Sequence, residues 1–286
     1  RGLDLVGRRL SGSREIPIVF TETGSAGPED ASPADLGPSP YVCGDPVKTD
    51  RPDVFVGREE LLDQIRRQVV QSGNVVLLEG NRRAGKSSIL WHLEGRGAVP
   101  GWLGVYCSLQ GAEGAKAGGI PTPEVFRTMA YEIAQSVRRL NGSVPLPDGT
   151  ILDGDRKLGI KRAVDDGIGE TSPFGDFREY LELVLAELSK QGLGLLLMLD
   201  EFDKLQEGID KKITSSQVPE NIRFLAQSYP KFSTILTGSR RLKRLREEYW
   251  SVLFGLGTRF SVSSLPKPAA DRLLTEPVKG RLAYAA

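Results

Sequence analysis

The chain has 286 residues, enough for one large α/β domain with a tail or for two small domains, and its 39% hydrophobic and 26% charged residues are typical of a soluble globular protein. The net charge of +1 excludes a global electrostatic attraction to nucleic acid, so any such contact has to be local. No apolar run approaches the roughly 20 residues that span a membrane.

Two further features concern the cellular compartment. Residues 1–10 are too charged to supply the apolar core of a signal peptide. The two cysteines, Cys43 and Cys107, form no disulfide framework, and Cys107 lies in an apolar, strand-like run. We therefore expect a cytoplasmic protein without a membrane partner.

The first 46 residues differ in composition from the rest. Residues 23–46 are rich in Gly, Pro, Ser and acidic residues, as linkers are, and only residues 16–20 before them have a strand-like pattern. We predict an upstream segment and a Gly/Pro-rich linker over residues 1–46. Residues 14–20 keep a second interpretation, namely a strand added to the edge of the main domain.

From residue 47 onward, helical and strand patterns alternate. Apolar residues at helical spacing predict helices near residues 61–73, 122–140, 172–188 and 219–228. Short apolar runs predict strands near residues 75–78, 103–109, 193–199, 232–237 and 258–262. This alternation predicts a three-layer α/β/α fold with a mostly parallel five-stranded sheet, in one domain over residues 47–286.

Residues 141–171 interrupt this alternation. They are polar, glycine-rich and poorly periodic, and they begin with an Asn-Gly turn at Asn141 and Gly142. A loop of this length within a compact domain is unusual. We therefore expect an insertion or a flexible loop, with its charged middle, residues 153–166, on the surface.

The best-defined motif is a glycine-rich loop after the strand at residues 75–78. It matches the phosphate-binding pattern GxxxxGK followed by Ser or Thr at every fixed position, in the strand–loop–helix context that the pattern requires. In such a loop, backbone amides and the start of the helix hold the β-phosphate of a nucleotide. The loop consists of Gly80, Asn81, Arg82, Arg83, Ala84, Gly85, Lys86, Ser87 and Ser88.

Two side chains of this loop predict specific contacts with a nucleoside triphosphate. Lys86 is expected to bridge the β- and γ-phosphates, and the Ser87 hydroxyl is expected to ligate Mg²⁺. Arg82 and Arg83 either reach phosphates or point to solvent. The single histidine, His92, lies on the following helix, where we expect a structural role.

The apolar strand at residues 193–199 is followed by two carboxylates. The carboxyl end of a buried parallel strand faces the crevice in which α/β sheets bind ligands. We predict that Asp200 completes the metal site by holding a water of the Mg²⁺ shell, and that Glu201 is the catalytic base that orients and deprotonates the attacking water. Asp203 and Lys204 are expected to cap or begin the next turn.

The strand at residues 232–237 supplies a third set of polar residues. If it lies between the first and third strands, Thr237 or Ser239 hydrogen-bonds the water or a phosphate, and Arg240 senses the charge of the γ-phosphate. The alternative is a strand that stops in a Gly-Ser turn. A basic cluster follows, which is a solvated helix face, an arginine finger for a neighbouring subunit or a contact to DNA. The cluster consists of Arg240, Arg241, Lys243, Arg244 and Arg246.

Together, residues 55–59, 80–88, 195–201 and 234–240 resemble the AAA+/STAND branch of P-loop ATPases, in which STAND denotes signal-transduction ATPases with numerous domains. The resemblance spans roughly residues 53–278, and its two paired nucleotide motifs are specific for the superfamily. Bacterial and archaeal STAND ATPases share the motif arrangement. The resemblance implies ATP and Mg²⁺ as cofactors, and ATP hydrolysis that is slow or conditional.

The resemblance also implies roles for further residues. Phe55, Val56, Gly57 and Arg58 match a box that lies near the adenine, and Arg240 matches a γ-phosphate-sensing arginine of some subfamilies. Members of the family continue into a helical lid that has no counterpart in this sequence. We therefore expect the chain to be a piece of a longer protein.

The function that the resemblance implies is a switch that couples nucleotide state to oligomerisation and to activation of an attached effector, in response to an activating ligand. Bacterial members often serve in antiviral defence. Two alternatives stay open: an AAA+ ATPase that acts on DNA complexes, as in replication initiation or transposition, and a nucleotide-gated scaffold with little turnover.

Overall fold

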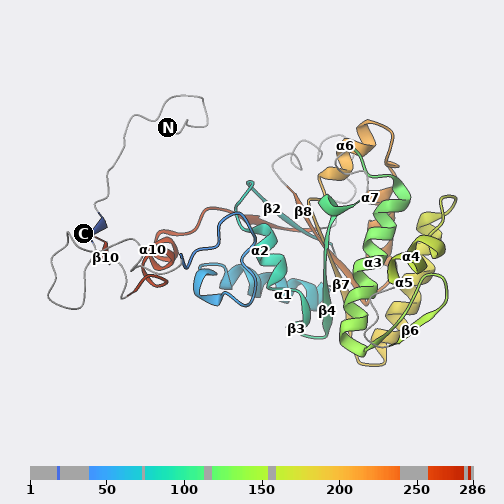
Figure 1. Ribbon diagram of the computed structural model, residues 1–286, viewed down its shortest axis with the longest axis horizontal. Coiled ribbons are helices and arrows are strands. Elements are labelled where there is room, and N and C mark those ends of the chain that lie inside the picture. The colour runs from blue at the N-terminus through green and yellow to red at the C-terminus, as the bar shows by residue number, and fades with distance from the viewer. Residues whose placement is uncertain are drawn as a thin grey trace. The chain divides into compact units, whose positions relative to one another are not determined.

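Figure 1 shows the computed structural model of the chain, which describes residues 18–19, 39–72, 75–112, 118–153, 159–238, 257–279 and 283–284. The chain divides into two compact units. The larger unit consists of Pro46–Asp50 and Arg58–Ser264, and the smaller of Arg1–Asp45, Arg51–Gly57 and Leu265–Ala286. Residues 47–286 include residues of both units, and their assignment to one domain remains a prediction.

The larger unit is built on a six-stranded sheet in the order β3-β4-β7-β8-β2-β9. Neighbouring strands run parallel except β3 and β4, so the predicted mostly parallel sheet is confirmed and its five expected strands are all present. The strands are β2 (Val75–Gly80), β3 (Gly95–Val99), β4 (Trp102–Ser108), β7 (Gly194–Asp200), β8 (Phe232–Gly238) and β9 (Thr258–Val262).

Strand β3 corrects the predicted number of strands from five to six within the described residues. It is an edge strand that pairs antiparallel with β4, and its register shifts between Arg96 and Val99. Only its last residue is buried, and it contains two glycines. Such a strand has no hydrophobic pattern that distinguishes it from a loop, so the sequence did not reveal it.

The centre of the sheet is formed by β7 and β8. All seven residues of each strand are buried, and the two strands pair in parallel from Leu195 opposite Phe232 to Leu199 opposite Leu236. A strand that is covered on both faces needs apolar residues at almost every position, which is the pattern that Leu195–Leu199 shows. The parallel pairing places the carboxyl ends of both strands at one edge of the sheet.

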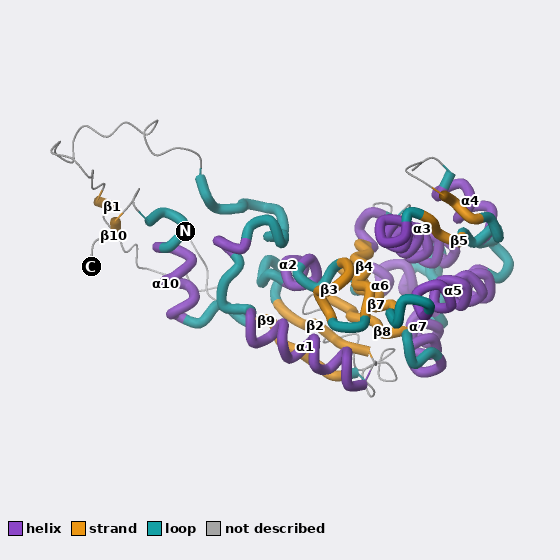
Figure 2. The backbone as a smooth tube through the Cα atoms, turned by 90° about the horizontal axis from the view of Figure 1, so that it is seen from below, coloured by secondary structure: helices purple, strands orange, loops and turns teal. Residues whose placement is uncertain are grey.

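Helices cover both faces of the sheet, as predicted for three layers (Figures 1 and 2). Helices α3, α5 and α7 pack on one face through a single apolar cluster, and α1 and α2 lie on the other. In the described part of the chain, no helix is long and apolar enough to cross a membrane. The helices that the structure describes in this unit are α1 (Glu59–Ser72), α2 (Lys86–Trp91), α3 (Thr122–Asn141), α4 (Ile160–Gly167), α5 (Pro173–Ser189), α6 (Lys204–Asp210) and α7 (Val218–Ser228).

The predicted helices follow the apolar spacing of the sequence. In α1, the buried residues Leu62, Ile65 and Val69 recur at intervals of three and four, and two glutamates occupy the first turn, where they interact favourably with the helix dipole. Helix α3 ends at Gly142, whose φ of 70° is readily adopted by glycine and closes the helix. Asp203 and Lys204 begin α6, as expected.

Residues 141–171 contain more regular structure than the sequence indicated. They form a hairpin of β5 (Ser143–Pro145) and β6 (Ile151–Asp153), followed by α4. Val144, Ile160 and Val164 are buried and belong to the same apolar cluster as α3 and α5. The charged residues that the structure describes between 153 and 166 are exposed, as predicted, whereas the apolar residues of α4 are buried. Helix α4 is so short that its apolar face does not stand out in the sequence.

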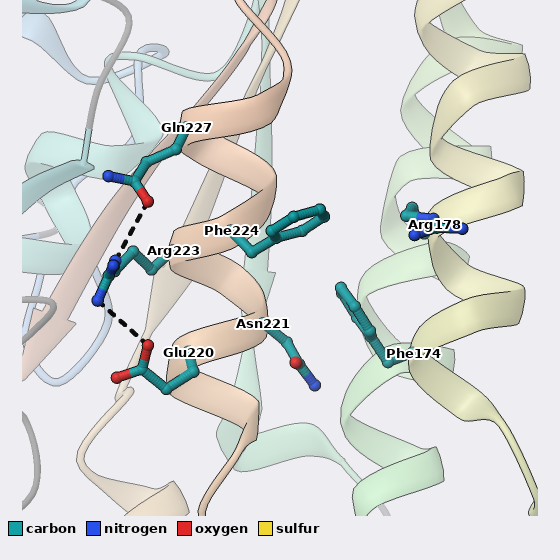
Figure 3. Close-up of a pocket in the computed structure, with 7 residues that line it drawn as sticks. All are labelled: Phe174, Arg178, Glu220, Asn221, Arg223, Phe224 and Gln227. Carbon is teal, nitrogen blue, oxygen red and sulfur yellow. Dashed lines mark hydrogen bonds and ion pairs between the residues drawn. The ribbon is translucent and has the colours of Figure 1, made fainter.

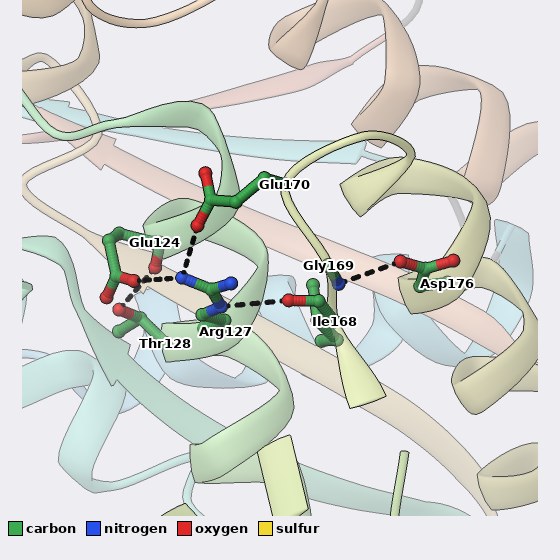
Figure 4. A network of polar contacts seen from close by, with 7 residues as sticks. All are labelled: Glu124, Arg127, Thr128, Ile168, Gly169, Glu170 and Asp176. Atoms are coloured by element: carbon green, nitrogen blue, oxygen red, sulfur yellow. Dashed lines mark hydrogen bonds and ion pairs between the residues drawn. The ribbon is translucent and has the colours of Figure 1, made fainter. Parts of the chain in front are cut away.

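Arg127 on α3 holds the end of this stretch in place (Figure 4). Its Nε donates to the carbonyl oxygen of Ile168 at 2.9 Å, and its Nη1 lies 2.7 Å from Glu124 and 2.9 Å from Glu170. The amide of Gly169 donates to Asp176 on α5 at 2.9 Å. These bonds connect residues 168–170 to two core helices.

The smaller unit contains a two-stranded antiparallel sheet of β1 (Ile18–Val19) and β10 (Ala283–Tyr284), the 3₁₀ turn η2 (Pro52–Val54) and helix α10 (Lys267–Thr275). Of the strand predicted near residues 16–20, the structure describes Ile18 and Val19, which pair antiparallel with β10. The Tyr41 hydroxyl donates to the carbonyl oxygen of Leu274 at 2.9 Å, which ties the segment before η2 to α10.

Candidate functional site

The phosphate-loop motif forms the connection between β2 and α2. Two of its glycines meet local geometric demands. A Cβ on Gly80 would lie 2.6 Å from the carbonyl oxygen of Val262 on β9, and Gly85 has a φ of 93°. Arg83 also has a positive φ, of 64°, which is uncommon for a residue with a side chain. The loop is therefore a constrained turn, and constrained backbone of this kind is concentrated at functional sites.

Lys86, the first residue of α2, turns back over this loop. Its Nζ donates to the carbonyl oxygens of Gly80 at 3.1 Å and Asn81 at 2.9 Å. Burial lowers the pKa of its ammonium group, and the nearby carboxylates of Asp200 and Glu201 act in the opposite direction. The structure thus places a partly desolvated cation at the mouth of the loop.

The loop and the end of β7 are joined by a hydrogen bond between Ser87 and Asp200. Ser87 Oγ donates to Asp200 Oδ2 at 2.6 Å, across 113 residues of sequence. Asp200 is 3% exposed. The two residues that the sequence assigned to a metal site are therefore brought together by the fold. A serine that donates its proton to a carboxylate keeps its lone pairs available for a cation.

Asp200 accepts three further hydrogen bonds. The Tyr106 hydroxyl donates to Oδ2 at 3.0 Å, the Glu201 amide donates to Oδ1 at 3.0 Å, and the Thr237 hydroxyl also donates to Oδ1. The donors come from β4, from the end of β7 and from β8, which lies between β2 and β7 in the sheet. Thr237 was predicted to reach the site if its strand lies between these two strands, and the strand order meets this condition.

Glu201 is the residue on which hydrolysis was predicted to depend. It has a φ of 56°, and its amide also lies 3.3 Å from Thr237 Oγ1. Burial raises the pKa of its carboxyl group, and the charge of Asp200 raises it further. Among the described residues, no hydrogen-bond donor contacts its buried Oε2. The arrangement leaves a partly buried carboxylate oxygen available to accept a proton from a ligand or a water.

The remaining loop residues differ in their exposure. Asn81, Arg82 and Arg83 are exposed, and whether the two arginines reach phosphates or point to solvent remains open. The charge of Arg82 nevertheless lowers the pKa of Glu201, in opposition to its burial, so this arginine lies within electrostatic reach of the carboxylate. Ser88 is buried, and its hydroxyl accepts from the amide of Val47 at 3.0 Å.

The predicted adenine box is divided between the two units. Phe55, Val56 and Gly57 belong to the smaller unit, where an added Cβ on Gly57 would lie 2.4 Å from the side chain of Ala269. Arg58 belongs to the larger unit, and its Nη2 donates to the carbonyl oxygens of Ala84 at 3.2 Å and Ser263 at 2.6 Å. Arg58 therefore holds the phosphate loop against the segment after β9.

Sequence reasoning missed two aromatic residues at the site. Tyr106 is not part of any motif, and its ring stacks on that of Trp91 with centroids 4.8 Å apart. Lys48 Nζ lies 4.3 Å from the centroid of the Trp91 ring. Burial raises the pKa of the Tyr106 hydroxyl, and Asp200 raises it further, so the hydroxyl remains a donor. Tyr106 is the fifth residue of β4, and the sequence around it does not indicate a function.

Other predictions lie outside the described residues. Ser239, Arg240 and the rest of the basic cluster through residue 246 follow β8 directly in the sequence. Their proposed roles in sensing the γ-phosphate, in acting as an arginine finger or in DNA binding therefore remain predictions.

The residues at this site fit Mg²⁺ and a nucleotide triphosphate. The side chains that meet here are oxygen donors, which Mg²⁺ prefers, and the described residues contain no group of three or more His, Cys, Asp or Glu that would form a metal cage. Mg²⁺ is commonly held by one or two protein oxygens together with phosphates and water. The lone pairs of the Ser87 hydroxyl are available to bind Mg²⁺ in this way. The partly desolvated Lys86 ammonium group is suited to contact the phosphates.

A separate depression of about 330 Å³ lies between α5 and α7 (Figure 3). The rings of Phe174 and Phe224 meet edge to face across it, with centroids 6.1 Å apart. None of the predicted site residues lines it. Its lining residues are Phe174, Arg178, Glu220, Asn221, Arg223, Phe224 and Gln227.

Comparison with known proteins relates this structure to ATPases at the level of the fold. No family model and no curated protein matches the sequence. The structure is similar to the Walker-type ATPase PABY2304 of Pyrococcus abyssi, with a TM-score of 0.54 and 17% identity. The similarity covers 82% of this chain and 61% of that chain, so the chain spans about three-fifths of the solved ATPase. The predicted P-loop NTPase fold is thereby confirmed.

Two further solved structures are more distant. The Aeropyrum pernix ORC2 protein, solved as ADPNP-ADP complexes, has a TM-score of 0.47 and 15% identity, over 83% of this chain and 54% of that chain. The Aeropyrum pernix ORC1 protein, solved in complex with DNA, has a TM-score of 0.45 and 18% identity, over 82% of this chain and 53% of that chain. Similarities of this size carry no weight for function.

Proposed function

We propose that this chain binds ATP with Mg²⁺ and hydrolyses it. The observation that carries the proposal is the 2.6 Å hydrogen bond between Ser87 Oγ and Asp200 Oδ2. It joins the phosphate-loop motif to the carboxylate at the end of a buried strand, and an Asp-Glu pair without such a loop would be weak evidence. The choice of ATP rests on the resemblance of the motifs to those of P-loop ATPases.

Each residue of the site would have a distinct role in binding or hydrolysis. The loop amides and Lys86 would hold the β- and γ-phosphates, and Ser87, whose hydroxyl is held by Asp200, would ligate the magnesium ion. The bound ion neutralises the negative charge that develops on the phosphates. Glu201 accepts a proton from the attacking water, for which a partly buried carboxylate with a raised pKa is a suitable base. Arg240 is the candidate sensor of the γ-phosphate.

Two variants test this proposal. Lys86→Ala is expected to lose at least tenfold in affinity for a fluorescent ATP analogue, because it removes the cation that the loop positions. Glu201→Gln is expected to bind the analogue as wild type does and to lose phosphate release by 100-fold or more, because it removes only the base. Wild-type ATP binding by Lys86→Ala would contradict the whole proposal.

The same measurements distinguish an ATPase from a nucleotide-gated scaffold without meaningful turnover. If wild type and Glu201→Gln both bind ATP and both release phosphate only at the rate of the buffer, the chain is a nucleotide-gated scaffold. If phosphate release by wild type vanishes in Glu201→Gln, the scaffold interpretation is excluded.

We propose further that hydrolysis resets a STAND-type switch that oligomerises and activates an attached effector. The support is the resemblance of the motifs together with their placement, because Glu201 and Thr237 lie at the ends of adjacent strands where a γ-phosphate would favour one conformation. ATP-dependent oligomerisation, measured by light scattering, tests this part. A mass that is the same with ATP, ADP and no nucleotide would exclude it for this chain.

The alternative is an ATPase that acts on DNA complexes. Its support is the basic cluster of residues 240–246, which directly follows β8 in the sequence. Fluorescence anisotropy with duplex DNA at low salt tests it, with Arg241, Lys243 and Arg244 neutralised as the comparison. Binding that weakens with salt and is lost in that variant would favour this alternative, and no binding at low salt would exclude it.

A further inference from the structure

Tyr106 makes a contact at the proposed magnesium site that the nucleotide motifs do not account for. Its hydroxyl donates to Asp200 Oδ2 at 3.0 Å, and the same oxygen accepts from Ser87 Oγ at 2.6 Å. Tyr106 lies on β4, where it pairs with Met198 of β7, two residues before Asp200. The parallel register of β4 and β7 therefore brings the phenol to the carboxylate.

The hydrogen bonds to Asp200 leave little freedom to its carboxylate. A carboxylate offers about four acceptor positions, two on each oxygen. Ser87 and Tyr106 donate to Oδ2, while the Thr237 hydroxyl and the Glu201 amide donate to Oδ1. A carboxylate with donors at every position is held in one orientation. That orientation directs the Ser87 proton to Oδ2 and leaves the Ser87 lone pairs for a cation.

The ring of Tyr106 is itself held in place. It stacks on Trp91 at 4.8 Å with an angle of 28° between the rings, and Lys48 Nζ lies 4.3 Å from the Trp91 centroid. Offset stacking and cation–π contacts restrict the orientation of such rings. Trp91 is the last residue of α2, the helix that Lys86 begins. The stack therefore connects the phosphate-loop helix to β4 beside the metal site.

We propose that Tyr106 is a positioning residue for magnesium, which holds Asp200 through Oδ2 so that Ser87 is presented to the ion. The inference rests on the proposed function, because the ion is taken to bind together with ATP. Without the phenol oxygen, Oδ2 has one donor and the carboxylate can turn away from Ser87. Binding of ATP with Mg²⁺ then weakens, whereas binding of ATP without a metal ion does not.

The variant Tyr106→Phe tests this inference, because it keeps the ring that stacks on Trp91 and removes only the hydroxyl. The matched control is Tyr131→Phe, which removes a hydroxyl on α3 that accepts from Gln135 at 2.8 Å. Binding of a fluorescent ATP analogue is measured in a Mg²⁺ titration and, in parallel, in EDTA. Thermal melting of each variant checks that the fold is kept.

We expect the Mg²⁺ midpoint of Tyr106→Phe to rise about tenfold, as for the loss of one hydrogen bond to a charged group. The Mg²⁺ midpoint of Tyr131→Phe and the EDTA affinity of both variants should stay within about twofold of wild type. A wild-type Mg²⁺ midpoint in Tyr106→Phe, or an equal loss with Mg²⁺ and EDTA, would overturn this inference alone. If wild type binds no nucleotide under either condition, the proposed function fails and the role of Tyr106 fails with it.

Discussion

The backbone amide of Glu201 donates to the side-chain oxygen Oδ1 of Asp200 at 3.0 Å, so the Asp200 carboxylate holds the backbone of the acidic residue that follows it. This turn places Glu201 at a φ of 56°. Holding a non-glycine residue in that region costs on the order of 1–3 kcal/mol, which the surrounding structure must offset. The strain and the partly desolvated carboxylate occur at the same residue, as is common at catalytic sites.

Glu201→Gln is expected to raise the free energy of unfolding at neutral pH. Burial and then the charge of Asp200 raise the pKa of Glu201 in the folded state. The stability that this group contributes is therefore fully present below its unfolded pKa of about 4.3 and is lost as the pH rises through the folded pKa. Gln stays neutral throughout, so the advantage of the variant should be absent near pH 4 and grow toward pH 7.

Urea denaturation at several pH values between about 4 and 7 measures this effect. Glu179→Gln, which changes an exposed carboxylate on α5, is the matched control. A Glu201→Gln variant that is less stable than wild type at pH 7, or equally more stable at every pH, would show that desolvation of this carboxylate is not a cost to the fold.

Gly80→Ala is expected to destabilise the larger unit by about 1–3 kcal/mol. The added Cβ would lie 2.6 Å from the carbonyl oxygen of Val262, with which Gly80 pairs across β2 and β9. Backbone atoms in a sheet cannot give way as a flexible side chain does. Gly111→Ala is the control, since nothing lies within 4 Å of its added Cβ. Equal denaturation midpoints for both variants would contradict the close approach of β9.

The nucleotide motifs could be predicted because their residues are local. The loop at residues 80–88 has fixed spacing, and Asp200 with Glu201 directly follows an apolar run whose burial on both faces the structure confirms. Tyr106 could not be predicted, because its contact with Asp200 depends on the register between β4 and β7. The same holds for the contact of Arg58 with Ala84, which lies 26 residues away in the sequence, although the motif had named Arg58 itself.

In the fold, too, elements with a local sequence pattern could be predicted, and elements that depend on tertiary contacts could not. Helices with long apolar faces, such as Thr122–Asn141, and fully buried strands, such as Gly194–Asp200, have strong periodic signals. Strand β3 and helix α4 are short elements with few apolar residues, and they take their structure from pairing with β4 and packing on α3. Tertiary context of this kind leaves no pattern in a single sequence.

Arg58→Ala is expected to weaken ATP binding and to lower the free energy of unfolding by about 1.5–3 kcal/mol. Its Nη2 donates to both Ala84 in the phosphate loop and Ser263 after β9, so the loop loses an anchor. Arg58→Lys should restore little, because one ammonium does not reproduce the fork of a guanidinium. Chemical denaturation and ATP titration measure both effects. Arg67→Ala, on the exposed side of α1, is the control, and equal losses in the two alanine variants would show that the anchor is unimportant.

Comparison of Thr237→Val with Thr234→Val distinguishes an effect on ATP hydrolysis from an effect on stability. Both threonines are fully buried on β8. The Thr237 hydroxyl donates to Asp200 Oδ1, and the Thr234 hydroxyl donates to the carbonyl oxygen of Leu197 at 2.9 Å. Valine has the same shape without the hydroxyl, so each variant should lose roughly 1–3 kcal/mol of stability because a buried acceptor loses a donor.

Turnover should distinguish the two threonines. Thr237→Val removes a donor to Asp200 and an acceptor for the Glu201 amide, so both carboxylates lose a constraint, and ATP hydrolysis should fall at least tenfold. Thr234→Val leaves these carboxylates as they are and should hydrolyse ATP at the wild-type rate at a temperature where both variants are folded. If the two variants lose turnover in equal measure, the loss follows from stability, and Thr237 has no specific role in holding the carboxylates.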